Sequence, residues 1–362
     1  MTVPIQRGEI PCEHPFEKEV KEYLDRMAKD YSASRWGELT GLARHHLDKF
    51  GIDWSVPRSP AQLQSFPKIF MSAVRYAHLK TDTPHPAMNE ATDPDEYEVA
   101  LLSAAQNPGL NRYFHEAMWR MPSTATVSRG VPLQSILGFH FGERPITGVD
   151  LGAGLHIALP LMNTPFYTEA RFPGSDEIAE FARGKVNISL GVGIDVMPQR
   201  GDVDWAKACS LNFIEGLPSQ EQFSFDAMID FATSEPEKFP YVVGDVSRAP
   251  ECAAVAKDAL RKGGVGDGEA DFVLTSFIRH QLDHSEAAQN ALDALVAGLV
   301  TDGGIWIDIG EELLEDSFHE GEDANQVKVY QKIGGSMNLV GVPFELAEVR
   351  RIGQTNLSYF GV

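Results

Sequence analysis

A short apolar segment that runs directly into two glycines is the feature that most constrains this chain. Residues 146–151 are apolar enough for a buried strand and contain a single acid, Asp150, and Gly152 and Gly154 follow at once. Residues 155–162 continue with an apolar run that predicts a helical turn. A strand, a glycine turn and a helix open the nucleotide site of a doubly wound α/β sheet, at the carboxyl end of its first strand. Glycine at this place lets a ligand approach the backbone.

The segment after residue 146 alternates predicted strands with helices or loops, which is typical of an α/β sheet. Apolar, β-branched runs predict four more strands, at residues 186–194, 241–245, 271–275 and 305–309. Residues 344–352 and 357–361 are predicted as an antiparallel pair that closes the sheet.

The region before this sheet has helical periodicity and no alternating strands. Apolar residues at helical spacing predict helices at 16–27, 36–50, 67–79, 97–105, 110–121 and 133–139. We therefore expect an all-α domain over residues 1–140 and an α/β domain over residues 141–362.

Composition excludes several classes of partner. The 362 residues carry 52 acids against 31 bases, a formal net charge of -21, which argues against nucleic acid as the main partner. Three cysteines without a CxxC motif favour a reducing cytoplasmic location. Apolar runs fall short of the roughly 18 residues needed to span a membrane, so no membrane partner is expected. The oligomeric state stays open.

The glycine motif distinguishes between two kinds of nucleotide. The third glycine of a dinucleotide fingerprint would fall at position 157, which is Ile157. Residues 149–154, Val-Asp-Leu-Gly-Ala-Gly, closely resemble the first motif of class I S-adenosylmethionine (SAM)-dependent methyltransferases. The order of elements over residues 146–362 resembles their catalytic domain. The helical region resembles, less specifically, a poorly characterised group of bacterial relatives.

This resemblance implies the fold and the cofactor. The fold would be α/β, a doubly wound and mostly parallel seven-stranded sheet with a closing antiparallel hairpin, preceded by an all-α N-terminal domain. The cofactor would be SAM. The implied cofactor-binding residues lie at the ends of the strands: Asp150, Gly152, Ala153, Gly154, Asp195, Val196, Asp245, Val246, Ser276 and Phe277.

Asp195 follows the second predicted strand, where a carboxylate can accept both ribose hydroxyl protons. This acid usually lies about 20 residues after the glycines, and Asp195 lies farther along the chain. An extra helix, capped near Ser175 and ending at Gly184, would hold the additional residues. The alternative for Asp195 is a helix cap or a surface acid.

Three further residues have two interpretations each. By resemblance Asp245 would accept a hydrogen bond from the adenine amino group, or it is an ordinary turn acid. Asp150 would help to hold the methionine ammonium, or its place in the strand is due to chance; a charge in a buried strand needs a partner, which favours the first. His156 either lines the site or is a packed or exposed histidine.

The segment after the fourth strand would face the methyl group and its acceptor, again by resemblance. His280 is the candidate general base and Arg279 the candidate carboxylate ligand, and both are predicted as catalytic residues. Phe277 would pack on the sulfonium by cation–π attraction. The alternative is that Arg279 and His280 begin a surface helix. His280 and His284 have the spacing of two zinc ligands but lack a third, so no metal is expected.

Methyl transfer from SAM to a small molecule is the leading functional hypothesis, with residues 1–140 as a lid or substrate domain. One alternative keeps SAM and cyclises its own tail to azetidine-2-carboxylate, with release of methylthioadenosine. Another is a SAM-binding protein without catalysis. An NAD-dependent enzyme is disfavoured by Ile157.

Overall fold

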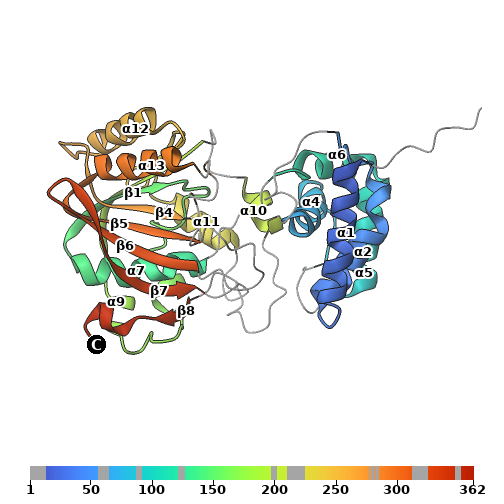
Figure 1. Ribbon diagram of the computed structural model, residues 1–362, viewed down its shortest axis with the longest axis horizontal. Helices are drawn as coiled ribbons and strands as arrows, with labels where there is room; N and C mark the ends of the chain where they lie inside the picture. The colour runs from blue at the N-terminus through green and yellow to red at the C-terminus, as the bar shows by residue number, and fades with distance from the viewer. Residues whose placement is uncertain are drawn as a thin grey trace, which may run out of the picture. The chain divides into compact units, whose positions relative to one another are not determined.

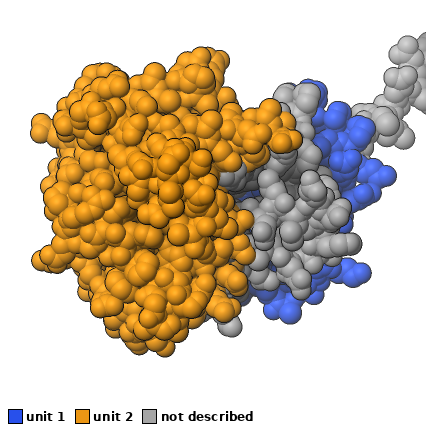
Figure 2. All heavy atoms as spheres, turned by 60° about the vertical axis from the view of Figure 1, so that its left-hand side comes forward, with its two compact units in different colours: residues 1–124, 203–217 blue, residues 125–202, 218–362 orange. Residues whose placement is uncertain are grey.

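The computed structural model divides the chain into two compact units, coloured separately in Figure 2. The first contains residues 1–124 and 203–217, and the second contains residues 125–202 and 218–362. The residues that the structure describes are 14–55, 65–86, 92–120, 127–196, 202–209, 225–276, 278, 282, 285–311, 325–346 and 352–362.

The first unit is built of helices, as the periodicity predicts. Its helices are α1 (Pro15–Asp30), α2 (Arg35–His46), the 3-10 helix η1 (Leu47–Phe50), α4 (Phe66–Lys80), α5 (Pro94–Gln106), α6 (Pro108–Ala117) and α10 (Val203–Cys209). Asp93 and Asn107 precede α5 and α6, and their side chains accept hydrogen bonds from free backbone N–H groups of the first turn. The chain leaves η1 at Gly51, whose φ of 62° is left-handed, which agrees with the predicted end of this helical segment at residue 50.

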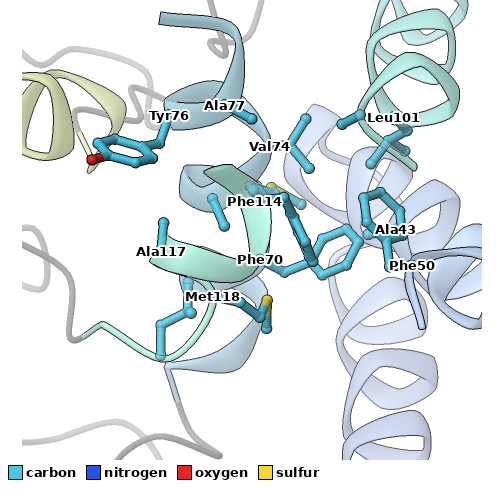
Figure 3. Close-up of a cluster of buried hydrophobic side chains, with 14 of the residues drawn as sticks. Ala43, Phe50, Phe70, Val74, Tyr76, Ala77, Leu101, Phe114, Ala117 and Met118 are labelled. Atoms are coloured by element: carbon cyan, nitrogen blue, oxygen red, sulfur yellow. The ribbon is translucent and has the colours of Figure 1, made fainter. Parts of the chain in front are cut away.

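Aromatic side chains form the centre of the helical core (Figure 3). The rings of Phe50, Phe70 and Phe114 have centroid separations of 4.4, 4.9 and 5.4 Å, and all three are buried. They come from η1, α4 and α6, so the cluster joins three elements. Burying each such ring stabilises the fold by about 1.5–3 kcal/mol.

α10 belongs to the helical unit although the chain reaches it only after the second strand of the sheet. The ring of Trp205 lies 5.8 Å from that of Tyr76 on α4, and the guanidinium of Arg120 lies over both rings. The Nζ atom of Lys80 is 2.6 Å from a carboxylate oxygen of Asp204. An aromatic contact, cation–π contacts and an ion pair therefore attach α10 to α4.

The second unit is an α/β unit with one eight-stranded sheet. The strands are β1 (Pro145–Leu151), β2 (Asn187–Asp195), β3 (Tyr241–Val243), β4 (Ala270–Ser276), β5 (Val300–Glu311), β6 (Asn325–Ile333), β7 (Ser336–Leu346) and β8 (Ile352–Thr355). Their order is β3-β2-β1-β4-β5-β6-β7-β8. The pairs from β3 to β5 are parallel, and the pairs from β5 to β8 are antiparallel. The carboxyl ends of the five parallel strands therefore meet at one edge.

Helices cover both faces of this sheet, as a doubly wound fold requires. α12 (Ala249–Lys262) and α13 (Glu286–Leu299) lie on one face, and α7 (Val127–Phe141) and α9 (Ala179–Ala182) lie on the other (Figure 1). Shorter helices are α8 (Pro165–Thr168), α11 (Phe225–Thr233) and the 3-10 helix η4 (Leu357–Phe360). The first face packs Val149, Leu151 and Val192 against α12 and α13.

The antiparallel end of the sheet differs from the sequence prediction. Three strands rather than a hairpin close the sheet, so it has eight strands instead of seven among the described residues. Residues 325–333 form β6, which was missed, and residues 357–360 are a 3-10 helix rather than a strand. In β6, buried Val327 and Val329 flank Lys328, which is the alternation of a strand with one buried face. Gly334 and Gly335, with φ of 59° and 85°, make the tight turn into β7.

The segment after the glycine turn also differs. Residues 155–162 form a series of turns rather than a helix. The φ angles of Gly152, Gly154 and His156 are 68°, 54° and 50°, and left-handed residues at this spacing are incompatible with an α-helix. The extra helix expected from Ser175 is also shorter than predicted, because α9 begins only at Ala179.

Candidate functional site

The glycine turn lies at the carboxyl edge of the sheet, between β1 and β2. The backbone N–H groups of Gly152 and Ala153 donate to the carbonyl of Ile194, at 2.8 and 3.0 Å. The turn is thus attached to the last residues of β2. The φ of Gly152 is 68°, which favours glycine, and a Cβ atom here would lie 2.8 Å from the end of the Ile278 side chain.

Gly154 and Asp195 are brought together by this turn. The N–H of Gly154 donates to Oδ2 of Asp195 at 2.9 Å. A Cβ atom at Gly154 would meet no atom of the described residues within 4 Å, so the space beside this backbone is open among them. The carboxylate is thereby positioned over the turn, 41 residues along the chain from the glycine. Val196 follows Asp195 with an exposed side chain.

Asp150 lies under the turn, on the sheet face opposite to the one that packs against α12 and α13. Its neighbours Val149 and Leu151 belong to that core, and side chains alternate along a strand. Asp150 is only 3% exposed. Burial raises the pKa of its carboxyl group, the charge of Asp195 adds to this rise, and His156 opposes it.

His156 is buried beside Asp150, so of its two interpretations the structure shows a packed residue. Nδ1 lies 3.6 Å from Oδ2 of Asp150, and Nε2 lies 3.2 Å from the carbonyl oxygen of Gly191. A Cβ atom on Gly193 would overlap the imidazole. Gly193 is paired with Asp150 in the register of β1 and β2, so the missing side chain on β2 makes room for the ring.

Asp245 is found in a turn that leads into α12. Its Oδ1 accepts hydrogen bonds from the N–H and the hydroxyl of Ser247, at 2.9 and 2.6 Å. The Ser247 hydroxyl is the main cause that holds the pKa of Asp245 below its usual value. The side chain is 41% exposed. These contacts account for a structural role, and the assignment to an adenine amino group stays a prediction. Val246 turns into the core.

Ser276 is the last residue of β4, the strand next to β1. Its Oγ is buried and has no hydrogen-bond partner among the described residues. A buried hydroxyl without a partner is costly, which favours a ligand or water at this place. Phe277, Arg279 and His280 lie outside the described residues, so their predicted roles stay predictions. The same holds for the histidine pair, because His284 is also outside them.

Inside the sheet, besides Asp150 and His156, there is a second set of polar residues, which form hydrogen bonds with one another and were not predicted from the sequence. The indole N–H of Trp306 donates to Oγ1 of Thr275 at 2.8 Å, and the Thr275 hydroxyl donates to Oδ1 of Asp308 at 2.6 Å. All three residues are buried, Thr275 on β4 and Trp306 and Asp308 inside β5. The signal in the sequence was the acid inside an apolar strand, the same signal that identified Asp150.

At the carboxyl edge of the sheet, these residues combine space beside the backbone of Gly154 with several hydrogen-bond acceptors. Asp150 and Asp195 contribute carboxylates, and Gly154 contributes space. Carboxylates beside exposed backbone suit a ligand that has hydroxyl and ammonium donors. The described edge contains no cluster of three or more residues that could hold a metal ion.

Comparison with known proteins gives similarity at the level of solved structures. No protein-family model matches the chain, and no curated protein is similar to it. The chain is similar to an O-methyltransferase family protein from Burkholderia thailandensis, with 14% identity, a TM-score of 0.30, and coverage of 79% of this chain and 57% of that one.

Two other similar structures are also methyltransferases. A SAM-bound amino pentose methyltransferase from Micromonospora echinaspora has 11% identity, a TM-score of 0.29, and coverage of 58% and 65%. An rRNA methyltransferase from Streptomyces viridochromogenes has 13% identity, a TM-score of 0.30, and coverage of 53% and 77%. The chain thus spans less than two thirds of the length of the first two structures. Similarities this low do not determine the activity or substrate of this chain.

The expected absence of a nucleic-acid partner stays a prediction. Within the part of the chain that the structure describes, no helix combines the length and the apolar character needed to cross a membrane.

Proposed function

We propose that this chain is a SAM-dependent methyltransferase that acts on a small molecule. One observation carries the proposal: the backbone of Gly154 is open to a ligand and also holds the carboxylate of Asp195 beside it. A nucleoside needs such an arrangement, since its ribose hydroxyls require an acceptor and its ring system requires close approach to the backbone.

The residues present at this edge fit SAM. Gly154 leaves free the volume that a side chain would fill. Asp195 is an acceptor for ribose hydroxyls, and the N–H of Gly154 fixes the position of its Oδ2. The unpartnered Oγ of Ser276 is a hydrogen-bonding group for the methionine tail. SAM has no phosphate, so the turns at residues 155–162 suit it better than a dinucleotide, which needs a helix N-terminus.

In this proposal the residues of the chain bind and orient the reactants. Asp195 holds the ribose, Asp245 accepts from the adenine amino group, and Asp150 faces the methionine ammonium. Bound SAM supplies an electrophilic methyl group. Alignment with the acceptor and exclusion of water would provide most of the rate enhancement.

Residues after β4 complete the proposed active site. His280 would take a proton from the acceptor, and Arg279 would bind an acceptor carboxylate through its two parallel N–H groups. Phe277 would pack against the sulfonium. The expectation of a small acceptor is supported by the net charge of -21, which repels polyanions.

Isothermal titration calorimetry with SAM, NAD and FAD tests the cofactor. We expect binding of SAM alone. Stronger binding of NAD or FAD would contradict the proposal.

Mass spectrometry of the nucleoside product, after incubation with SAM and candidate acceptors, tests the reaction. Acceptor-dependent S-adenosylhomocysteine is the expected product. Methylthioadenosine formed without an acceptor would instead establish cyclisation, and binding without any product would leave a SAM-binding protein.

A further inference from the structure

The contacts of His156 determine where its ring carries a proton. Nε2 lies 3.2 Å from the carbonyl oxygen of Gly191, and a carbonyl oxygen only accepts, so Nε2 must donate. Nδ1 has no hydrogen-bond partner within 3.5 Å among the described residues, and it faces Oδ2 of Asp150 at 3.6 Å. If both were unprotonated, two lone pairs would face each other inside the protein. A proton therefore lies between them, on either the carboxyl group or the imidazole.

The surroundings hold the ring in this position. His156 is fully buried, and its φ of 50° is rare for a residue other than glycine. The rings of Phe239 and Tyr241 lie 6.4 and 6.5 Å from the imidazole, and Gly193 leaves the space that the ring fills. A strained backbone with a packed ring indicates a defined position for this side chain.

Three other titratable side chains lie near the pair, and each has a contact of its own. Tyr167 on α8 donates its hydroxyl to the carbonyl of Ala158, and burial raises its pKa. Asp195 on β2 is an acceptor that engages Gly154. Tyr241 on β3 faces the imidazole through its ring. Asp150 and His156 thus form a pair with one proton and no net charge, directly under the glycine turn.

We infer that the ammonium of the cofactor's methionine tail displaces the proton that Asp150 and His156 share. The inference rests on the proposed function, and it makes His156 a positioning residue for the cofactor. On binding, the O–H or N–H bond of the shared proton breaks and the proton passes to solvent. The pair then carries one negative charge, which the positive charge of the ammonium balances. A neutral pair without a ligand also avoids an uncompensated buried charge.

Calorimetry in two buffers of different ionisation enthalpy counts the protons released on binding. S-adenosylhomocysteine carries the ammonium and methylthioadenosine lacks it, although both contain the same nucleoside. With the wild-type protein below about pH 7.5, where the ligand's amine stays charged, we expect release approaching one proton with the first ligand and none with the second. As the pH increases, the affinity for S-adenosylhomocysteine should rise about tenfold per pH unit over the range in which the free pair keeps its shared proton. The reason is that one proton is released on binding. The affinity for methylthioadenosine should stay constant.

Asp150→Asn is the matched variant. Its side chain has the shape of an aspartic acid, and its amide N–H can donate to Nδ1 of His156 but does not titrate. In this variant we expect S-adenosylhomocysteine to bind more weakly, without proton release and with an affinity independent of pH. Circular dichroism and thermal melting establish that the variant is folded, and the wild-type comparison of the two ligands needs no variant.

Two outcomes separate this inference from the proposed function. If SAM and both nucleosides fail to bind, the proposed function and this inference fail together. If they bind, but the two nucleosides release equal numbers of protons in the wild type, or Asp150→Asn keeps the wild-type release, the inference alone is overturned.

Discussion

At the scale of single residues, Gly154 gives the sharpest test of the proposed site. Gly154→Val should abolish SAM binding, measured by calorimetry, because a side chain would fill the open volume beside the turn.

Valine is also strained at a φ of 54°, so the Gly154→Val variant needs a control for backbone strain. Gly142 has a φ of 57° and equally open space, but it follows α7, away from the turn. Gly142→Val should therefore lose stability and keep SAM affinity. Unchanged binding in a folded Gly154→Val protein would contradict the assignment.

Asp195 and Asp271 are a matched pair of acids. Asp195 is at the carboxyl end of β2, and Asp271 is near the amino end of β4. Asp195→Ala should weaken SAM, S-adenosylhomocysteine and methylthioadenosine alike, by roughly 2–5 kcal/mol, because all three share the ribose. Asp271 also binds a backbone N–H, that of Thr147 at 2.7 Å, near the amino end of β1. Asp271→Ala should lower stability without changing these affinities, as competition binding would show. A loss limited to ligands with an amino-acid tail would place Asp195 elsewhere in the site.

The sequence predicted Asp195 and Gly154 better than it predicted His156. A carboxylate after the second strand and a glycine after the first follow from strand order alone, and the Gly154–Asp195 contact is consistent with that reasoning. The position of His156 depends on a left-handed φ and on the space above Gly193. Both depend on tertiary contacts, which an apolar run cannot reveal.

At the scale of elements, α7 and η4 are joined by a histidine with a predictable response to acid. Nε2 of His140 lies 2.6 Å from the hydroxyl of Tyr359, and burial lowers the pKa of His140 to about 4. The unfolded chain binds a proton at about pH 6.5, whereas the folded chain does so only near pH 4. The contribution of His140 to stability should therefore fall as the pH drops between these values and change no further below them.

Urea denaturation of the wild type and of His140→Gln, at about pH 7 and about pH 5, measures this contribution. Glutamine can keep a hydrogen bond to Tyr359 but does not titrate in this range. The variant should lose less stability than the wild type on acidification. Equal losses in the two proteins would assign the acid sensitivity to other groups.

Helices were easier to predict than the closing strands, for physical reasons. Helix ends are encoded locally, as at Asn107 before α6 and at Gly51 after η1. β6 contains many polar residues, and only Val327 and Val329 show that one of its faces is buried. The Gly334–Gly335 turn was a usable hairpin signal. By contrast, the short 3-10 helix at residues 357–360 has strand-like composition.

At the scale of the whole molecule, the helical unit is formed by two segments that are separate in the sequence. Residues 203–217 belong to that unit, although the sequence before and after them belongs to the sheet unit. The sequence could not predict this, because α10 is only seven residues long and its partners Tyr76 and Arg120 lie far back in the chain. The expected role of residues 1–140 as a lid stays a prediction.

Two buried tryptophans test this division, one in each unit. Trp205→Ala should destabilise the helical unit by about 3–5 kcal/mol, since it removes the ring that packs against Tyr76 and under Arg120. Hydrogen exchange followed by mass spectrometry should then speed up in α4 and α6 and stay unchanged in β1, β2 and β4. Trp306→Ala should give the reverse pattern, because its indole stacks on Tyr330 and donates to Thr275 within the sheet. If either variant loosens both units equally, the two units unfold as one cooperative structure, and α10 couples them rather than belonging to the first alone.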